Sequence, residues 1–524
     1  MRLVVPALAL AVTVPAATGP AGTAGAATAS ATTASTAAVP AVVSPWDWPS
    51  YGHDAQHTFH GRTTLTPSSV RTLQQAWFFP TGDAVTATPT VVGNTVYAGS
   101  WDDYFYALDL QRGTVRWKVR LQPQNGITPY PGQHQRDVTS DGGLVTSSAW
   151  FQPASGSRPA LVIFAGGYTL YALNAATGAV YWTHVYSGMP GPPQPDVDST
   201  RIFSSPVVVG NKVLFGVDED GQPDSAGYVV AASLASGDPV WEFQTDVAVP
   251  GSTKVLDDSC GSVWSSGTVL PDLGLVVFGT ADCDFLGAAP YADSVIALRI
   301  ANGTLAWKFH PLGQGPACDD DFGATANAGV TALGRSVFLG AGSKNGTYYS
   351  LDPRTGRLRW AANVVFGGSS GGFIGTTAYD GGRVIGATGL GDFLPSKKGV
   401  RPVCDPSDPR DGQQQNPTDH AFDAATGAVV WQASGDYSFS ATTVAGGMMF
   451  NGLALGHAVV VRDARTGKLI TQVPLPAFNW SGIATVGNAL VLGLGSTSDA
   501  NGSGIEVLTP GGATPVVPRV TATP

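Results

Sequence analysis

The stretch LDLQRGTVRW at residues 108–117 decides the fold, because its pattern returns six more times along the chain. In every copy a Gly stands four residues before the last position, and that last position is Trp in all copies but one. The other copies are LNAATGAVYW (173–182), ASLASGDPVW (232–241), LRIANGTLAW (298–307), LDPRTGRLRW (351–360), FDAATGAVVW (422–431) and RDARTGKLIT (462–471). Self-similarity at a long period marks a repeat architecture.

Each copy joins two expected strands through a tight turn. The Gly supplies a left-handed backbone position without steric cost, and the Trp opens the next strand, where it can staple one unit to its neighbour. Successive glycines lie 40 to 71 residues apart, enough for one four-stranded blade of roughly 40–45 residues plus loop insertions. With 67 Gly and 38 Pro in 524 residues, the pattern predicts an all-β protein with many turns. A β-propeller is its natural closure, because it leaves only short, protected edges.

The number of blades depends on both ends of the chain. The segment LQQAWFFPTGD (73–83), which contains Trp77, looks like the final strand of a blade with no repeat before it. The segment NALVLGLGSTSDANGSGIEVLTP (488–510) has strands but no final Trp. The two halves are complementary. We therefore expect an N-terminal strand to complete the last blade and to close a ring of eight. A seven-bladed ring, or a propeller of another lineage, is the alternative.

The N-terminus predicts export. It opens MRLVVPALALAVTVPAA, one Arg followed by an apolar run and small residues suited to a signal peptidase. We expect a signal peptide at 1–30, a low-complexity linker at 31–45, one propeller at 46–515 and a disordered tail at 516–524. The apolar run is too short and too rich in Pro for a membrane span, so the sequence predicts a secreted protein.

Charge and composition exclude some partners. The net charge is −10, only 13% of residues are charged, and no basic stripe is present. Nucleic-acid binding is therefore disfavoured.

The four cysteines predict disulfides in an oxidising compartment. Cys260 and Cys283 flank an expected hairpin and would be cross-strand neighbours. Cys318 and Cys404 both lie in long loops and could form a second bond. Their spacing matches neither a metal finger nor a covalent haem site.

Acidic residues gather in the expected inter-strand loops, where propeller sites form. The densest group is Asp319, Asp320 and Asp321, and such adjacent carboxylates repel one another unless a cation or water separates them. For this group alone, a solvated acidic turn is the favoured interpretation over a metal ligand or general base. Asp282 and Glu219 follow strands in other repeats, and oxygen ligands from several loops suit a hard cation such as Ca²⁺.

Other catalytic signatures are missing from the sequence. It contains no G-x-S-x-G, no H-E-x-x-H and no phosphate-binding glycine loop. His53 and His57 are four residues apart, but their polar N-terminal segment reads as a loop, so we give them little weight as ligands.

Several longer stretches resemble the quinoprotein alcohol dehydrogenases, eight-bladed propellers that bind pyrroloquinoline quinone (PQQ), and most of all their polyvinyl-alcohol-dehydrogenase-like branch. WDWPSYGHDAQHT (46–58) is similar to the family's opening W-P-x-Y-G-x-D, and SVWSSGTVLPDLGLVVFGTAD (262–282) to V-W-S-S-P-x-x-D-x-x-x-G-L-x-Y-x-G-T-G-N. DDDFGATAN (319–327) is similar to D-x-D-F-G-A-S-P, and GAGSKNGTYYSLDPRTGRLRW (340–360) to G-x-x-K-x-G-x-x-Y-A-L-D-x-x-T-G-x-x-x-W. The family's vicinal Cys-Cys pair is absent from this sequence.

The resemblance implies roles for individual residues. Trp264 would form the floor under the quinone ring, and Lys344 would be the cation near the quinone oxygens. Asp321 would be the general base, with Asp319 as the fallback. Asp282 replaces a metal-ligating Asn and would hold Ca²⁺ together with Asp321 and Glu219.

The resemblance also implies an activity, the oxidation of an alcohol to a carbonyl with PQQ and Ca²⁺ as cofactors. Asp321 is followed by Phe322-Gly323, with no second acid two residues on, which by resemblance favours Ca²⁺ over a lanthanide. Electrons would leave to an external acceptor such as a cytochrome c. The substrate could be a small alcohol or a polymer.

Two other functions stay open at this point. A secreted, non-catalytic binding or scaffold propeller could share the repeat without the quinone, but it would not need the acidic loops, Trp264 and Lys344 together. A hydrolase or lyase is disfavoured, because the sequence shows no His-based or paired-Glu constellation.

Overall fold

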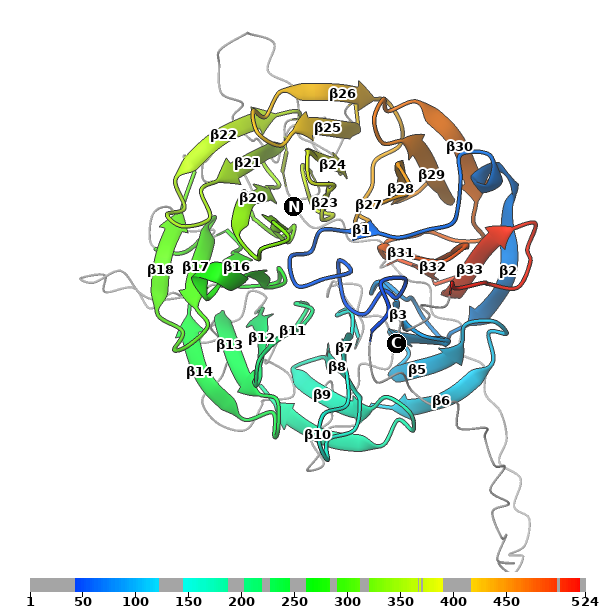
Figure 1. Cartoon of the computed structure of the whole chain (residues 1–524), viewed down its shortest axis with the longest axis horizontal. Coiled ribbons are helices and arrows are strands. Elements are labelled where there is room, and N and C mark those ends of the chain that lie inside the picture. The colour runs from blue at the N-terminus through cyan, green and yellow to red at the C-terminus, as the bar shows by residue number, and fades with distance from the viewer. Residues whose placement is uncertain are drawn as a thin grey trace, which may run out of the picture. The chain divides into compact units, whose positions relative to one another are not determined.

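The apolar runs around each repeated turn form strands of eight four-stranded sheets, arranged around a central axis (Figure 1). The computed structural model describes residues 43–121, 145–186, 202–218, 227–245, 261–282, 290–311, 320–365, 367–368, 371–389, 416–496 and 500–518. Residues 1–42, which contain the predicted signal peptide, lie outside this set. The predicted boundaries of leader, linker and tail therefore remain predictions.

We number the blades 1 to 8 along the chain and give their strands from the axis outward. Blades 1 and 2 contain β3 Thr90–Val92, β4 Thr95–Gly99, β5 Tyr104–Asp109, β6 Val115–Arg120, β7 Trp150–Gln152, β8 Leu161–Gly166, β9 Thr169–Asn174 and β10 Val180–Val185. Blades 3 and 4 contain β11 Val207–Val209, β12 Lys212–Val217, β13 Tyr228–Ser233, β14 Pro239–Gln244, β15 Thr268–Leu270, β16 Leu275–Gly279, β17 Val295–Arg299 and β18 Leu305–Phe309.

The second half of the ring repeats this plan. Blades 5 and 6 contain β19 Asn327–Val330, β20 Ser336–Gly342, β21 Thr347–Leu351, β22 Leu358–Asn363, β23 Ala378–Tyr379, β24 Arg383–Ala387, β25 Asp419–Asp423 and β26 Val429–Ala433. Blades 7 and 8 contain β27 Thr443–Ala445, β28 Met448–Gly452, β29 Ala458–Asp463, β30 Leu469–Pro474, β31 Ile483–Val486, β32 Ala489–Leu494, β33 Gly504–Pro510 and β2 Leu73–Pro80. The 3₁₀ turns η1 Ser69–Thr72 and η3 Pro271–Leu273 are the only helical elements of the described residues.

The two ends of the chain close the ring, as the sequence predicts. The outer strand of blade 8 is β2, which comes from the N-terminal side and pairs antiparallel with β33, placing Trp77 opposite Val507. The prediction of eight blades with a shared last blade is therefore confirmed.

Tryptophan staples join consecutive blades. In each of seven blades the outer-strand Trp donates its indole N–H to a backbone carbonyl of the next blade, at 2.7 to 3.1 Å. The donors are Trp77, Trp117, Trp182, Trp241, Trp307, Trp360 and Trp431. Each indole covers the repeat Gly of that next blade, whose φ lies between 67° and 80°, and a Cβ atom there would collide with the ring. The predicted roles of the Gly and the Trp are both confirmed.

The missing eighth Trp follows from the ring closure. Thr471 on β30 faces blade 8, whose outer strand β2 is not joined to β33 by a repeat turn. Instead η1 packs against both β30 and β33. An indole at position 471 would have no Thr-Gly turn to cover.

A segment that we call the strap, residues 46–64, runs across the middle of the ring (Figure 1). It exchanges backbone hydrogen bonds with seven of the eight blades, and β1 His60–Gly61 pairs in parallel with β27. The blade residues in these bonds are Val91, Phe151, Val269, Ala328, Tyr379, Val444 and Gly487. The polar residues around His53 and His57 predict a loop here, and in the structure the segment is bound to the inner strands.

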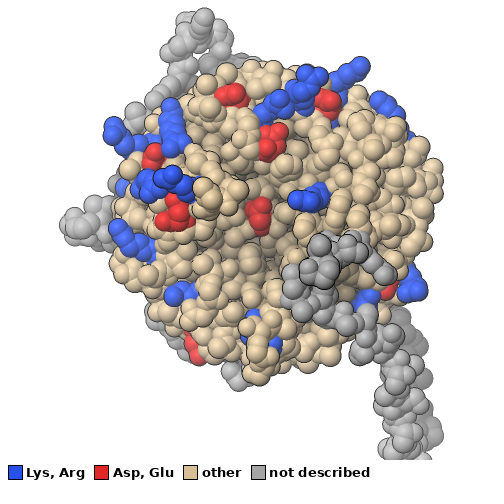
Figure 2. All heavy atoms as spheres, viewed as in Figure 1, with Lys and Arg blue, Asp and Glu red and all other residues tan. Residues whose placement is uncertain are grey.

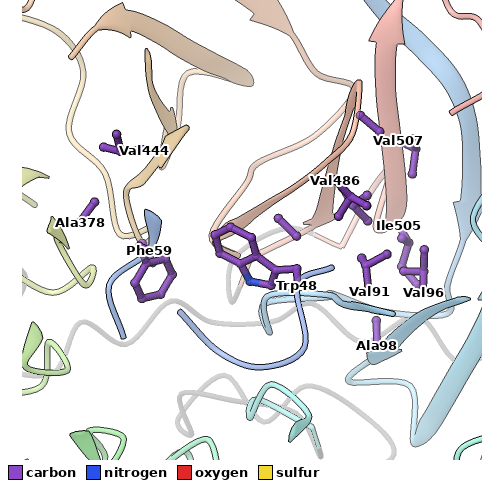
Figure 3. Close-up of a cluster of buried hydrophobic side chains, with 14 of the residues drawn as sticks. Trp48, Phe59, Val91, Val96, Ala98, Ala378, Val444, Val486, Ile505 and Val507 are labelled. Carbon is purple, nitrogen blue, oxygen red and sulfur yellow. The ribbon is translucent and has the colours of Figure 1, made fainter. Parts of the chain in front are cut away.

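The strap also contributes to the largest hydrophobic cluster. Trp48 and Phe59 are fully buried, and Trp48 lies between Phe59 and Val91 in Figure 3. Protein atoms fill the centre of the ring in the space-filling view, with few charged groups among them (Figure 2). Among the described residues, no helix has the length and hydropathy needed to span a membrane.

Glu506 is an acid buried among apolar residues of blade 8. Its side chain is 2% exposed, stands opposite Phe78 and Leu492, and its Oε2 has no hydrogen-bond partner within the described part of the chain. Burial raises the pKa of Glu506 to about 7. In the folded state the neutral form is therefore favoured at pH values below that pKa.

This raised pKa predicts that the free energy of unfolding depends on pH. Between the ordinary glutamate value of 4.5 and pH 7, the unfolded chain releases a proton that the folded chain keeps, so stability falls as pH rises. The contribution is about 3 kcal/mol. We expect Glu506→Met to gain that much stability over wild type between pH 4.5 and 7.5, measured by urea unfolding at each pH. The exposed Glu242→Met variant is the control. If the difference in unfolding free energy between Glu506→Met and wild type did not change with pH, the raised pKa of Glu506 would be contradicted.

Candidate functional site

Two neighbouring blades carry the predicted site residues at the same end of their inner strands. Trp264 precedes β15 and Asp282 follows β16 in blade 4. In blade 5, Asp321 precedes β19 and Lys344 lies between β20 and β21. Because β15 pairs antiparallel with β16, and β19 with β20, the start of one strand lies beside the end of the other. The four residues therefore meet at one end of the ring.

The Asp321 carboxylate is the centre of this group. Its Oδ2 lies 3.1 Å from Lys344 Nζ and accepts the indole N–H of Trp264 at 3.2 Å. Its Oδ1 accepts the backbone N–H of Asp282. The structure thus brings together Trp264, Asp282, Asp321 and Lys344, which we call the Asp321 cluster.

Burial gives the cluster unusual electrostatics. The side chains of Asp321 and Lys344 are 5% and 13% exposed, so their charges interact with little screening by water. Burial raises the pKa of Asp321, the positive charge of Lys344 opposes that rise, and the charge of Asp282 adds to it. Asp321 is a carboxylate whose affinity for a proton is tuned by its surroundings, as in many catalytic acids and bases.

The backbone of Lys344 is held on both sides of its Cα atom. Its backbone N–H donates to Asp321 O at 2.9 Å, and its carbonyl oxygen accepts the N–H of Gly368 at 3.1 Å. A Cβ atom at Gly372, where φ is 57°, would collide with that carbonyl. The glycine-rich stretch after blade 5 therefore fits closely around the Lys344 backbone.

Trp264 presents a flat surface beside these charges. The Lys344 ammonium lies 5.2 Å from the centroid of its ring, within the range of a cation–π interaction. Gly323 lies directly against the indole, and any side chain there would occupy the same space as the ring. The indole is only partly buried. The cluster could therefore receive a planar, negatively charged group, stacked on Trp264 and paired with Lys344.

Of the carboxylates expected near the cluster, the structure describes only some. Asp218 follows β12 in blade 3 and accepts the hydroxyl hydrogen of Ser262, and the backbone around Ser262 bonds to the stretch that ends in Asp282. Glu219 and Asp319 lie outside the described residues. Within the described set, no group of three or more His, Cys, Asp or Glu side chains is arranged to hold a metal ion. The Ca²⁺ site remains a prediction.

The predicted disulfides cannot be placed. Cys260, Cys283, Cys318 and Cys404 all lie outside the described residues.

Trp480 is a candidate site residue that the sequence analysis did not single out. It precedes β31 in blade 8 as Trp264 precedes β15 in blade 4, so both stand at the same end of the ring. Its indole N–H donates to Ala454 O at 3.1 Å, and its ring packs edge-on against Phe439. The signal was present in the sequence, since NWSG at 479–482 echoes VWSSG at 263–267.

Two profiles of known protein families match this chain. The profile of the family described as "Glucose/ethanol/alcohol dehydrogenase, beta-propeller domain" matches residues 48–365, more than half of the chain. A second profile, "Outer membrane protein assembly factor BamB", matches residues 292–492.

Among curated relatives, the chain is 24% identical over 389 residues to a polyvinylalcohol dehydrogenase of Pseudomonas sp., covering 68% of this chain and 57% of the relative. It is 24% identical over 453 residues to a polyvinylalcohol dehydrogenase of Sphingopyxis sp. (strain 113P3), covering 79% and 65%. The chain thus spans about three fifths of the length of these relatives.

Solved structures agree on the fold. A europium-containing methanol dehydrogenase superposes with a TM-score of 0.68 at 18% identity, covering 89% of this chain and 98% of that one. The quinohemoprotein alcohol dehydrogenase from Comamonas testosteroni gives 0.66 at 17% identity, covering 92% and 82%. At these identities the likeness establishes the eight-bladed architecture and leaves the chemistry to the site residues.

Proposed function

The chain belongs to the family of glucose/ethanol/alcohol dehydrogenase β-propeller domains, and from this we propose that it oxidises an alcohol to a carbonyl with PQQ as its cofactor. The observation that carries the proposal is the contact of a buried Asp321 with Lys344 and Trp264 at one end of the ring. That arrangement combines a base, a cation and a flat stacking surface.

The residues of the cluster fit a planar anionic cofactor. Trp264 would stack on the ring system, and Lys344 would pair with its oxygens. Bound there, PQQ would supply the electron-accepting centre of the reaction. The two side chains would fix the plane and orientation of the cofactor.

Asp321 is the proposed general base. A carboxylate oxygen has more than one acceptor position, so Asp321 can accept the hydrogen of a substrate hydroxyl while it keeps its bonds to Lys344 and Trp264. Burial raises the pKa of Asp321, which strengthens it as a proton acceptor, and the Lys344 ammonium opposes that rise and so favours the ionised carboxylate. Proton removal by a positioned base contributes roughly 10²–10⁴-fold to a rate.

Ca²⁺ is the proposed metal, with Asp282, Asp321 and Glu219 as its ligands. One observation and one general rule support it: the backbone N–H of Asp282 donates to Asp321 Oδ1, which places the two residues side by side, and carboxylate oxygens are the ligands that Ca²⁺ prefers. When bound, the metal would act as a Lewis acid.

Substrate, acceptor and location complete the proposal. The names of the relatives favour a secondary alcohol, either small or as part of a polymer such as polyvinyl alcohol. Electrons would pass to an external acceptor such as a cytochrome c. The apolar run and small residues of MRLVVPALALAVTVPAA (1–17) support action outside the cell, after removal of a signal peptide.

Dye reduction tests this function. Purified protein incubated with PQQ and Ca²⁺ should reduce an artificial acceptor when a secondary alcohol or polyvinyl alcohol is added, and a chelator should remove most of that activity. Protein without PQQ, and PQQ without protein, are the controls. Absence of alcohol-dependent reduction across primary, secondary and polymeric alcohols, with cofactor binding verified, would refute the activity.

The second candidate function is a secreted, non-catalytic scaffold. The match of residues 292–492 to the BamB profile favours it. The solved BamB of Moraxella catarrhalis superposes with a TM-score of 0.51 at 15% identity, covering 83% of this chain and 99% of that one. A scaffold has no need of a buried base paired with a cation beside an indole, which is why we rank it second.

A further inference from the structure

The strap is bonded to the two blades that carry the Asp321 cluster. The N–H of Val269 on β15 donates to Ala55 O at 2.8 Å, and Gln56 Nε2 donates back to Val269 O at 3.1 Å. On β19, the N–H of Ala328 donates to Gln56 O at 2.9 Å. The strap thus follows the inner strands that begin just after Trp264 and Asp321.

Among these contacts of the strap with blade 4, the one made by His57 reaches the residue nearest in sequence to Trp264. Its side chain is 1% exposed, with Nδ1 2.9 Å from Tyr51 O in the strap and Nε2 3.0 Å from Gly267 O in blade 4. Gly267 stands three residues after Trp264. A hydrogen on Nε2 donates to Gly267, and the imidazolium form donates to both carbonyls. Burial lowers the pKa of His57, and the two carbonyl contacts and the Asp54 carboxylate oppose that fall.

The loops that carry Trp264 and Asp321 are also bonded to each other. The N–H of Ser266 donates to Thr325 Oγ1 at 2.9 Å. Asn327 Nδ2 donates to His57 O at 2.6 Å. His57 therefore reaches the loop of Trp264 through its ring, and it reaches the start of β19, directly after the loop of Asp321, through its carbonyl.

We propose that His57 is a positioning residue for the Asp321 cluster: by binding Gly267 O it holds the loop of Trp264 against the loop of Asp321. The proposal rests on the proposed function for its consequence, the binding of a planar cofactor on Trp264. Sites of this kind require their side chains within about 0.5 Å of the productive geometry. A loop released three residues from the indole would not keep that precision.

Paired substitutions separate positioning from simple core packing. His57→Gln places an amide N–H near the position of Nε2 and can still donate to Gly267 O. His57→Asn places its amide near Nδ1 and can reach Tyr51 O only. The backbone at His57 has a φ of 50°, a conformation that Asn tolerates better than most residues, so backbone strain would not explain a defect in the Asn variant.

The first readout uses cofactor-free protein and is amide hydrogen exchange. In the His57→Asn variant, the peptide spanning 262–270 should exchange about tenfold faster than in wild type, while the Val444 region of blade 7 is unchanged. His57→Gln should stay within about threefold of wild type. The matched control is Thr63→Ala, which removes a strap bond to Gly487 in blade 8 and should leave 262–270 unchanged.

The second readout is PQQ affinity, which should weaken about tenfold in His57→Asn and little in His57→Gln or Thr63→Ala. Equal exchange at 262–270 in wild type and His57→Asn would overturn the proposal, as would uniformly faster exchange around the whole ring. If wild-type protein binds no PQQ, the proposed function fails, and the exchange result alone still decides the positioning role.

A further variant covers the case in which His57→Asn does not fold. Gln56→Met removes the neighbouring side-chain bond, from Nε2 to Val269 O, and leaves the strap backbone intact. In this variant the amides of 262–270 should exchange faster than in wild type, by a smaller factor than in His57→Asn, while the Val444 region stays unchanged. Unchanged exchange in a folded Gln56→Met protein would then count against the proposal.

Discussion

The Asp321→Asn variant should lose roughly 10²–10⁴-fold in kcat for alcohol oxidation. Asparagine keeps the size and planarity of the side chain, and its carbonyl oxygen can accept either the Trp264 indole N–H or the Asp282 backbone N–H. It cannot accept a proton from a hydroxyl at neutral pH. The measurement is dye reduction by PQQ-loaded protein at saturating alcohol, with PQQ binding measured separately.

Two comparisons make the Asp321 result specific. Asp352→Asn removes a carboxylate of a repeat turn that pairs with Arg359 at the surface, and this variant should keep full activity. Circular dichroism of both variants should match wild type. An Asp321→Asn protein that binds PQQ and retains activity within tenfold of wild type would mean that another group is the base.

The Trp77→Ala variant should lose about 3–5 kcal/mol of stability, which is large for a single substitution. Trp77 is 9% exposed, donates its indole N–H to Leu110 O at 2.7 Å and covers Gly113. It also stands on β2, the strand that closes the ring. Truncation leaves a cavity between blades 8 and 1 and an unpaired carbonyl at the seam.

Urea unfolding followed by far-ultraviolet circular dichroism measures this loss. The control is Tyr181→Ala, which removes an aromatic residue from an outer strand where it is 42% exposed, and whose effect should stay within about 0.5 kcal/mol. Equal unfolding midpoints for the two variants would show that the staple at the seam contributes little.

The fold was predictable because its determinants are local and repeated. The repeat Gly needs a left-handed backbone wherever it occurs, and each Trp meets the turn of the following copy, so spacing along the chain reports spacing in the ring. Even the loss of the last Trp, at Thr471, agrees with a blade that takes its outer strand from the N-terminal side.

The candidate site was partly predictable. Resemblance pointed to Trp264, Asp282, Asp321 and Lys344, and the structure brings these four together. Neither spacing nor composition could show that Asp321 binds the Lys344 ammonium and the Trp264 indole at once, because those contacts join loops of two blades. The role of Glu219 as a ligand remains a prediction.

The strap shows where sequence patterns carry too little information. The segment has no hydrophobic periodicity, and its polar residues suggest a loop. Its partners lie as far along the chain as Gly487, and the two partners of His57 in blades 4 and 5, Gly267 and Asn327, are more than 200 residues from it. A buried histidine in this segment is recognisable only once the ring has formed around it.

Calorimetric titration of the purified protein with PQQ in the presence of Ca²⁺ tests the central claim most directly. We predict binding of one PQQ per chain, at least about tenfold weaker in Lys344→Ala, because a charge-assisted contact to the cofactor is lost. The control is Lys308→Ala, which changes an exposed lysine of an outer strand and should bind as wild type does. Absence of binding at any Ca²⁺ concentration, or binding that Lys344→Ala leaves unchanged, would contradict a cofactor site at the Asp321 cluster.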